Sequence, residues 1–342
     1  MHMKIKKKIV MILPNLKTGG AEKVSLLILN NLRDDLFEKN LIIFEKKGRN
    51  INKVNKNINI INLNNPRLIF NTLKITNIIL KNKFDVVFSS FYHINIFLGF
   101  LKIFLDFKLV IRESNDPVHI INRHSKKRLI YFLYKFFYQK ANKIILPAKY
   151  LVKRLQNLSI SKSKINVIYN PVYKKKIINH SVVKDKYCAV GRLTYQKGFD
   201  NLIEIVNNSS LKKLFIIGNG AEKKNLVKIS NKNKIEFINE TNPKKFLMES
   251  KALLFSSRWE GMPNIALESL MYGTPIISIS KIDSILELQK ISKKNSVFII
   301  DKKNFNNFIK NFSRATKLNH KNLLSEDFSI KFAMKKYHKV LY

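Results

Sequence analysis

The feature that most constrains this chain is the alternation of short apolar runs with longer amphipathic stretches along nearly its whole length. A buried parallel strand reads as a short continuous apolar run, and a helix that covers a sheet reads as an amphipathic stretch. Strands separated by helices predict βαβ units and a parallel sheet. In the first half, strands are predicted at residues 9–13, 41–44, 58–63, 86–90, 109–112, 143–147 and 165–169, with helices at 22–32, 68–80 and 126–139.

A second series of runs begins after the segment Asn170-Pro171. A residue that precedes proline favours extended backbone, so this segment is suited to a hinge. A chain of 342 residues also exceeds one ordinary core. We expect an N-terminal Rossmann-like domain (1–170), a C-terminal Rossmann-like domain (171–327) and a C-terminal helix (328–342) that returns to the N-terminal domain. The second series predicts strands at 187–190, 214–217, 235–238, 252–256, 275–278 and 297–300.

The chain carries 64 Lys and Arg residues against 23 Asp and Glu residues, a formal charge of +41. A field of this sign attracts polyanions, which include nucleic acids and anionic membranes. The cations are spread along the sequence, whereas a nucleic-acid footprint is clustered on one element, so nucleic acid is not expected as a partner. Two explanations stay open: attraction to an anionic membrane surface, and a genome composition that favours Lys, Asn and Ile.

The single cysteine, Cys188, cannot form an internal disulfide, which favours a reducing compartment. No apolar run reaches the 18 or so residues that a membrane-spanning helix needs. The segment 94–107 is interrupted by Lys102 and Asp106 and is read as a buried helix, with contact to a membrane interface as the alternative. We expect a cytoplasmic protein, peripheral on the inner face of the cytoplasmic membrane.

The segment from Glu260 to Glu268 follows a predicted strand and opens a predicted helix, with Pro263 in the helix's first turn. Backbone amides at a helix N-terminus form an anion site. Glu268 would lie about five residues into the helix, roughly 7–8 Å along its axis. A pyrophosphate between the two acids would leave one near a sugar and the other near a ribose. The alternative is a helix with an acidic first turn and one solvated Glu.

The segment from Gly191 to Gly198 lies in another predicted strand-to-helix turn and contains Arg192 and Lys197. Two cations five residues apart can converge on one diphosphate, and charge-assisted contacts of this kind contribute about 1.5–3 kcal/mol each. The flanking glycines allow close approach of the backbone. A chance Arg and Lys in so basic a chain is the alternative.

Two further glycine turns, Gly218-Asn219-Gly220 and Gly19-Gly20, follow predicted strands. A tight turn is a sufficient explanation for each of them taken singly. All four motifs, however, lie at the carboxyl ends of predicted parallel strands, which is where α/β sheets bind ligands.

Four segments together resemble the retaining glycosyltransferases of family 4, which have the GT-B fold: GGAE (19–22), GRLTYQKG (191–198), GNGAEKKNL (218–226) and SSRWEGMPNIALES (256–269). Their order and spacing match that family over nearly the whole chain. The resemblance implies two Rossmann-like domains that face each other across a cleft. It also implies transfer of a hexose or N-acetylhexosamine from a UDP-sugar to a glycan acceptor, with retention of configuration, as in O-antigen, capsule or glycan assembly.

The resemblance implies a role for each matching position. Arg192 and Lys197 correspond to the pair that neutralises the donor diphosphate. Glu260 corresponds to the acid that contacts hydroxyls of the transferred sugar, and these three are the expected catalytic residues. Glu268 corresponds to the acid that holds the ribose. The other expected donor-binding residues are those whose backbone approaches the phosphates: Gly19, Gly20, Gly191, Gly218, Gly220, Gly261, Met262, Asn264 and Ile265.

Two parts of the chain depart from the family pattern. Lys281-Ile282-Asp283-Ser284 stands where the family usually has Gly-Gly, in a loop near the donor, so donor selectivity stays open. The N-terminal half lacks the familiar His-x-His pair. There Glu113-Ser114-Asn115 resembles the family's E-[HS]-N block and is the candidate to line the acceptor cleft, whereas a role for His93 near the acceptor has a structural alternative.

No metal and no cofactor are expected: the sequence contains no Asp-x-Asp, and a cation pair can replace Mg²⁺ at a leaving diphosphate. Two alternatives to a transferase are open. One is a GT-B sugar-nucleotide epimerase or hydrolase, which an assay with and without acceptor would distinguish. The other is a basic membrane- or nucleic-acid-binding protein, against which the joint presence of the Arg192/Lys197 and Glu260/Glu268 pairs argues.

The stretch 123–143 combines interleaved cations with many aromatic residues. Such a pattern suits the headgroup level of an anionic bilayer and the pyrophosphate of a polyprenyl-diphosphate-linked acceptor. The alternative is an ordinary Rossmann helix whose aromatic side is core. Apolar rings occupy nearly all sides between 129 and 138, which is more than one buried stripe needs and favours membrane contact.

Overall fold

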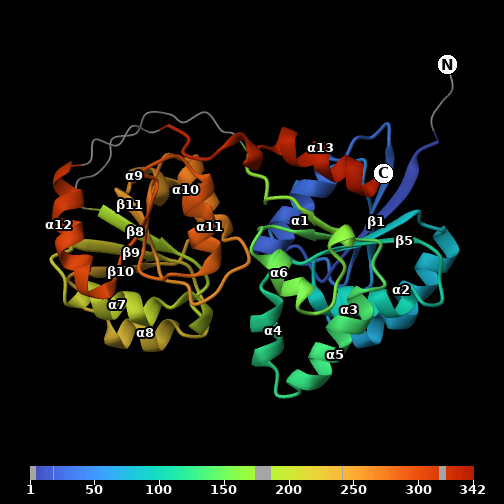
Figure 1. The fold of residues 1–342 in the computed structure, drawn as a ribbon, viewed down its shortest axis with the longest axis horizontal. Coiled ribbons are helices and arrows are strands. Elements are labelled where there is room, and N and C mark those ends of the chain that lie inside the picture. The colour runs from blue at the N-terminus through green and yellow to red at the C-terminus, as the bar shows by residue number, and fades with distance from the viewer. Residues whose placement is uncertain (1–4, 18, 174–185, 241, 316–320) are drawn as a thin grey trace. The chain divides into compact units, whose positions relative to one another are not determined.

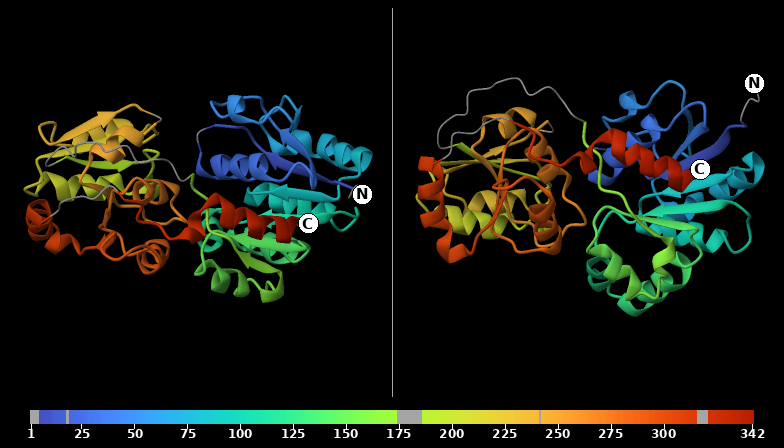
Figure 2. Two further views of the ribbon diagram at one scale, coloured as in Figure 1. Left: turned by 90° about the horizontal axis from the view of Figure 1, so that it is seen from above. Right: turned by 45° about the horizontal axis from the view of Figure 1, so that its top comes forward.

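The computed structural model describes residues 5–17, 19–173, 186–240, 242–315 and 321–342. The chain divides into two compact units, one of Met1–Pro171 with Ile330–Tyr342 and the other of Val172–Ser329. Each unit is built around one parallel sheet with helices on both faces (Figures 1 and 2).

The sheet of the N-terminal unit has seven strands in the order β3-β2-β1-β4-β5-β6-β7. The chain moves outward from β1 to β3 and then crosses back to β4, so the direction of winding reverses between β1 and β4. Ligands bind α/β sheets at such a reversal, outside the carboxyl ends of the strands. The strands are β1 (Lys7–Leu13), β2 (Phe37–Ile43), β3 (Asn59–Asn62), β4 (Val86–Ser89), β5 (Lys108–Arg112), β6 (Lys143–Leu146) and β7 (Ile165–Val167).

Helices cover both faces of this sheet (Figure 1). The helices α1 and α13 lie on one face, and α2, α3 and α5 lie on the other. The bounds are α1 (Gly20–Asn31), α2 (Leu68–Asn82), α3 (Tyr92–Leu101), α4 (Pro117–Arg123), α5 (Lys127–Tyr138), α6 (Leu151–Gln156) and α13 (Ile330–Leu341), with 3-10 turns at Ile51–Lys53 and Lys162–Lys164.

The sheet of the C-terminal unit has six strands in the order β10-β9-β8-β11-β12-β13, with the reversal between β8 and β11. The strands are β8 (Lys186–Val190), β9 (Lys213–Ile217), β10 (Ile235–Ile238), β11 (Ala252–Phe255), β12 (Ile276–Ser278) and β13 (Val297–Ile299). The helices are α7 (Phe199–Asn207), α8 (Lys223–Ile229), α9 (Lys244–Glu249), α10 (Asn264–Met271), α11 (Asp283–Ile291) and α12 (Phe305–Ala315), with 3-10 turns at Tyr195–Lys197, Lys302–Asn304 and Glu326–Phe328.

The central strands are apolar throughout because helices bury both of their faces. Every residue of β1 from Ile9 to Leu13 is completely buried, and β1 pairs in parallel with both β2 and β4. The C-terminal unit repeats this arrangement around β8, where Cys188 is also completely buried. The prediction of two Rossmann-like parallel sheets is confirmed.

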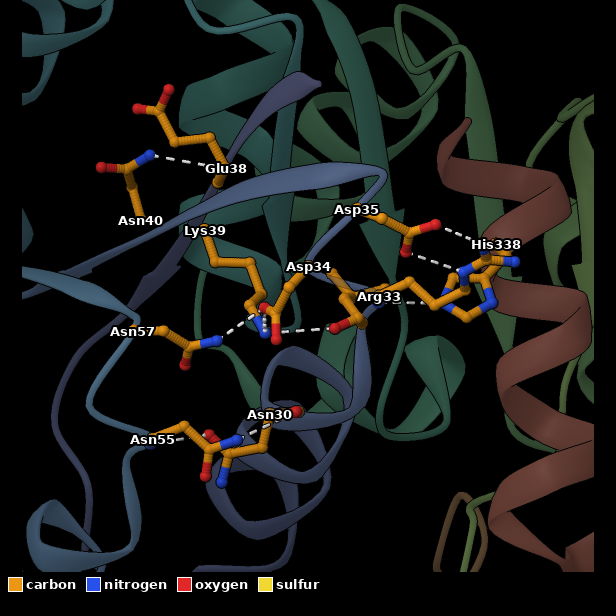
Figure 3. Close-up of polar contacts among 11 residues, drawn as sticks. Asn30, Arg33, Asp34, Asp35, Glu38, Lys39, Asn40, Asn55, Asn57 and His338 are labelled. Atoms are coloured by element: carbon orange, nitrogen blue, oxygen red, sulfur yellow. Dashed lines mark hydrogen bonds and ion pairs between the residues drawn. The ribbon is translucent and has the colours of Figure 1, made fainter. Parts of the chain in front are cut away.

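The C-terminal helix α13 packs on the N-terminal unit and buries Met334, Tyr337 and Leu341 in that unit's core. Its polar side meets the turn between α1 and β2: the backbone N–H of Arg33 donates to Nε2 of His338 at 3.3 Å (Figure 3). The His338 ring also stacks on Phe37, with the ring centroids 6.2 Å apart. A helix from the end of the sequence is thus part of the first unit's core.

One helix differs from its prediction. The segment 94–107 was expected to be a buried helix, but α3 ends at Leu101 and the residues that follow turn toward solvent. Phe104 is 69% exposed and Ile103 is 45% exposed. Lys102 and Asp106, which interrupt the apolar run, form an ion pair at 3.1 Å in this turn. The first part of the run, in α3, is therefore largely buried, and part of the turn that follows lies on the surface.

Candidate functional site

The motifs of the C-terminal half gather at one edge of its sheet. The strands β9, β8 and β11 are neighbours, and the turns that follow them carry the segments 218–222, 191–198 and 256–263. Because all three strands are parallel, their carboxyl ends lie at the same edge. The sequence motifs are thus brought together by the sheet itself.

Glycine allows two of these turns to touch. Gly218 has a φ of +141°, and a Cβ placed on it would lie 2.0 Å from the carbonyl oxygen of Gly191. A Cβ on Gly220 would lie 2.2 Å from the carbonyl oxygen of Leu193. The backbone N–H of Leu193 in turn donates to the carbonyl of Asn219 at 3.0 Å. These glycines are required for turn-to-turn packing, whatever they contact in a ligand.

The structure pairs two of the three expected catalytic residues. Lys197 Nζ lies 2.5 Å from Glu260 Oε1, and the two side chains are only 19% and 12% exposed. The hydroxyl of Ser257 donates to the same Oε1 at 3.0 Å. The third residue, Arg192, is exposed, and its guanidinium makes no hydrogen bond or ion pair within the described residues. A cation and an acid thus meet at this edge, beside an exposed arginine.

The position of Lys197 is fixed by its neighbours. Gly198 has a φ of +61°, and a Cβ on it would lie 2.2 Å from the carbonyl oxygen of Ser256. The Ser256 hydroxyl donates to the Lys197 carbonyl at 2.8 Å. A Cβ on Gly191 would lie 3.3 Å from Cδ of Lys197, so the missing side chain leaves room for the lysine stem.

Arg258 is a residue of this site that the sequence analysis missed. Its guanidinium donates to both carboxylate oxygens of Asp200, at 2.9 and 2.7 Å, and to the carbonyl of Tyr195 at 2.7 Å. It also lies 3.9 Å from the centre of the Tyr195 ring. The hydrogen bond from Arg258 lowers the pKa of Asp200. Arg258 lies within the segment 256–269 and Asp200 lies just after the segment 191–198, but the sequence does not show that the two side chains pair.

The second acid of the motif lies on the helix that follows. The helix α10 begins at Asn264, so Pro263 is its N-cap and not a residue of its first turn as predicted. Glu268 is the fifth residue of α10 and is half-buried, roughly 6 Å along the axis from the first. Gly261 and Met262 are buried directly before the helix. The first amides of a helix have no partner within it, so this end can accept an anion.

The glycine turn of the N-terminal unit, Gly19-Gly20, begins α1. A Cβ on Gly19 would lie 2.1 Å from the carboxylate of Glu22, which folds back over the turn. The chain before it is held by a second loop: Leu16 donates to the carbonyl of Lys47 at 3.0 Å. Gly48, with a φ of +123°, allows this contact, because a Cβ there would lie 2.2 Å from the Leu16 backbone.

The Glu113 side chain is buried and cannot contact an acceptor, which corrects the expectation for this residue; for Ser114 and Asn115, which are half-buried, the expectation stays a prediction. Its carboxyl is buried at the end of β5, where Tyr138 and Tyr134 of α5 donate to Oε2 at 2.6 and 3.3 Å. Burial raises the pKa of Glu113 to about 7, against the lowering effect of these hydrogen bonds and of Arg112. Burial also lowers the pKa of His93. Glu113 fastens α5 to the sheet from the inside.

A pocket of about 600 Å³ opens at the carboxyl ends of β12 and β13. Its charged lining residues are Lys281, Asp301 and Lys302, and Ile279 and Leu286 form part of its apolar wall. Lys281 belongs to the loop that departs from the family's Gly-Gly. This loop therefore presents a side chain where the family pattern has none.

Within the described ranges, no group of three or more His, Cys, Asp or Glu side chains is arranged to hold a metal ion. In the same part of the chain, no helix is long and apolar enough to cross a membrane. The charged groups at the edge of the C-terminal sheet include Lys197, Arg192 and Glu260, with Glu268 on α10.

Family comparisons match both units. Residues 18–175 match the family "Glycosyltransferase Family 4", and residues 174–325 match "Glycosyl transferases group 1". An uncharacterized glycosyltransferase of Methanocaldococcus jannaschii is 28% identical over 72% of this chain and 66% of its own length. A Campylobacter jejuni enzyme, "N-acetylgalactosamine-N,N'-diacetylbacillosaminyl-diphospho-undecaprenol 4-alpha-N-acetylgalactosaminyltransferase", is 29% identical over 50% of each chain. The alignments thus span two thirds of these relatives or less.

Solved structures match the whole fold. Anabaena HepE, solved with UDP and glucose, has a TM-score of 0.77 at 14% identity and covers 98% of this chain and 99% of its own. A sucrose-phosphate synthase from Thermosynechococcus elongatus has a TM-score of 0.80 at 13% identity, with 98% of both chains covered. At these identities the likeness establishes the fold, which is GT-B.

Proposed function

Because the chain belongs to the family 4-like glycosyltransferases of the GT-B fold, we propose that it moves a sugar from a UDP-sugar to a glycan acceptor. The observation that carries this proposal is the Lys197–Glu260 pair, held beside the N-terminus of α10 at the carboxyl edge of the sheet. A cation and helix amides at one edge match the diphosphate of a nucleotide-sugar, the carboxylate of Glu260 matches its sugar hydroxyls, and Glu268 on α10 matches its ribose.

In the proposed reaction, the bond between the anomeric carbon and the β-phosphate oxygen breaks, and its electron pair leaves with UDP. The acceptor hydroxyl bonds to the anomeric carbon, and its proton leaves with the UDP. Negative charge therefore develops on the diphosphate, where preorganised cations stabilise it most. Lys197 and Arg192 supply these cations without a metal ion, and the amides of the α10 N-terminus complete the anion site.

The two acids would act on different parts of the donor. Without donor, Glu260 neutralises Lys197; with donor, the diphosphate takes over that role and Glu260 is left to accept hydrogen bonds from sugar hydroxyls. Glu268 lies about one helical turn beyond the first residue of α10 and would hold the ribose. Family resemblance supports a retained α-configuration, with UDP on the face that the acceptor attacks.

The comparisons support the choice of donor. HepE was solved with UDP and also with UDP-glucose. The name of the Campylobacter jejuni relative specifies an N-acetylgalactosaminyltransferase. A UDP-hexose or UDP-N-acetylhexosamine is therefore the proposed donor, and the pocket that includes Lys281 is a candidate for the difference between them.

The proposed acceptor is a glycan carried on a polyprenyl diphosphate. The name of the Campylobacter jejuni relative specifies a diphospho-undecaprenol-linked acceptor, and an O-antigen glycosyltransferase of Escherichia coli is 25% identical over 63% of this chain. Such acceptors lie in the membrane, so the enzyme would work peripherally at the inner face of the cytoplasmic membrane, where anionic lipids attract its charge of +41.

A panel of UDP-sugars tests the proposal. Purified protein is incubated with each sugar, with and without lipid-linked glycan acceptors, and UDP release and product are measured. We expect UDP release from one or a few UDP-hexoses or UDP-N-acetylhexosamines, accelerated by acceptor. Equal release without acceptor would identify a hydrolase, and conversion of the sugar without UDP release would identify an epimerase.

A further inference from the structure

Five phenylalanine rings form a continuous row across two helices of the N-terminal unit. In order they are Phe104, Phe100, Phe137, Phe136 and Phe132, with neighbouring ring centroids 5.3, 5.9, 5.1 and 5.9 Å apart. The first two lie at the end of α3 and just beyond it, and the other three lie on α5, which packs beside α3 (Figure 1). We call this row the aromatic ridge.

The aromatic ridge faces solvent. Phe104 is 69% exposed and Phe132 is 58% exposed, and Phe100 and Phe136 are exposed to more than two fifths. Leu129 is also 50% exposed on α5. Single exposed apolar side chains are ordinary, but a contiguous aromatic row on a soluble surface marks a contact site.

The rings cannot turn inward, because the opposite side of α5 is already fastened. Tyr134 and Tyr138 are completely buried, and both donate to the carboxyl of Glu113 at the end of β5. The Tyr138 hydroxyl also accepts from Asn95 of α3 at 3.1 Å. With these tyrosines fixed inward, helical geometry directs Phe132 and Phe136 outward.

Cations border the aromatic ridge. The residues from 126 to 140 include five cations and no acid: Lys126, Lys127, Arg128, Lys135 and Lys140. Lys140 Nζ lies 5.0 Å from the centre of the Phe136 ring. The acid nearest in sequence on the α3 side, Asp106, is paired with Lys102. Apolar rings bordered by lysines match the boundary between lipid headgroups and acyl chains.

We propose that the aromatic ridge inserts into the interface of an anionic lipid bilayer, with the bordering lysines and Arg128 at the level of the lipid phosphates. This inference rests on the proposed function for its reason, since a lipid-linked acceptor lies in a membrane. A double-stranded nucleic acid would satisfy the cations with its phosphates but leave the rings in water, because its bases are stacked inside the duplex. The insertion surface therefore includes the end of α3 as well as α5.

The first test uses the chain's single tryptophan, Trp259. In a Trp259→Phe background, a new Trp replaces Phe104 or Phe132. The control replaces Ile229 of α8, which is 49% exposed in the other unit. On addition of phosphatidylglycerol-containing vesicles, the emission of both ridge tryptophans should shift to shorter wavelength, and brominated lipids should quench it. The control should stay unshifted.

The second test measures vesicle affinity. Phe104→Ser combined with Phe132→Ser should lower it about tenfold or more, since two largely apolar contacts are lost. Ile229→Ser should leave it unchanged. Gln in place of Lys126, Lys127, Arg128 and Lys135 should lower the affinity and remove most of its salt dependence. These positions are surface-exposed or nearly so, and circular dichroism checks that each variant is folded.

Several outcomes would overturn the proposal. One is no shift at positions 104 and 132, or an equal shift in the control. Another is a blue-shifted emission before vesicles are added, together with a dimer in sedimentation, which would assign the aromatic ridge to a second copy of the chain. UDP binding is measured in the unmodified protein and in every variant. If the unmodified protein does not bind UDP, this counts against the proposed function alone, because vesicle binding does not require UDP.

Discussion

Replacing Glu113 by Gln should remove a pH dependence of stability that this one carboxyl creates. The Glu113 side chain is buried at the end of β5, and the groups that face it are the Tyr134 and Tyr138 hydroxyls and Arg112. Burial raises its pKa from 4.5 to about 7 in the folded protein. The raised pKa values of both tyrosines lie well outside this range, so Glu113 is the member of the group that titrates there.

The sign follows from which state holds the proton. Between pH 4.5 and about 7, the unfolded chain releases the Glu113 proton while the folded chain keeps it. The free energy of unfolding therefore falls as the pH rises through this window and levels off above the folded pKa. The shift corresponds to about 3 kcal/mol. Glutamine keeps the shape and the acceptor oxygen but cannot ionise, so the variant should lose this slope.

Urea unfolding of both proteins at pH 5 and pH 8 measures the effect. Hydrogen exchange of peptides that contain β5 assigns the transition to the N-terminal unit, because two units need not unfold together. The wild type should lose about 2.5 kcal/mol more than Glu113→Gln between the two pH values, less than the full shift because the unfolded carboxyl is already largely ionised at pH 5. An exposed acid of the same sheet, Glu38, replaced by Gln, serves as the control. Parallel pH curves for all three proteins would refute the reasoning.

Four further predictions concern catalysis. Lys197→Ala and Arg192→Ala should each lower the turnover number about 100-fold or more without unfolding the protein, because both cations stabilise the departing diphosphate; near-normal turnover in both would contradict this. Glu268→Ala should instead weaken UDP binding about tenfold in calorimetry with less effect on turnover, since a ribose contact is equal in ground and transition states. EDTA should leave turnover unchanged. A loss of turnover in EDTA that added Mg²⁺ restores would show that a metal is needed. NMR of the first product should show an α-linkage from an α-donor.

The strands were predictable because their environment is uniform. A parallel strand with helices on both faces is apolar at every position, so its sequence shows a continuous run. The beginning of β2 was missed for the opposite reason: Glu38, Lys39 and Asn40 interrupt its apolar pattern. Lys39 is nevertheless almost fully buried and reaches Asp34, with 2.5 Å between the charged atoms. A long side chain that crosses the core to a surface acid leaves no apolar signature in the sequence.

The sequence predicted which turns form the site, but it did not predict which side chains contact each other there. Turns at one edge of a parallel sheet must lie together, so the prediction placed the motifs that carry Lys197 and Glu260 at the carboxyl ends of the strands. Whether the two side chains pair depends on loop backbones, and these follow from Gly198 and from the Ser256 hydroxyl beneath it. Arg258, which lies within the segment 256–269, joins the same two loops. Its role depends on Asp200 and Tyr195 lying within reach, which is a property of the folded loops.

The aromatic residues of α5 show why periodicity alone leaves a helix face undecided. Rings on nearly all sides of a helix exceed one buried stripe and favour membrane contact, but the sequence does not record which side the sheet occupies. Glu113 resolves this: its buried carboxyl needs hydrogen-bond donors, and alongside the backbone N–H of Asn115 the hydroxyls of Tyr134 and Tyr138 on α5 supply them. Those tyrosines fix the rotation of α5, and the phenylalanines, which need no polar partner, are left on the outer side. The distribution of Tyr and Phe around α5 thus separates its core side from its surface side.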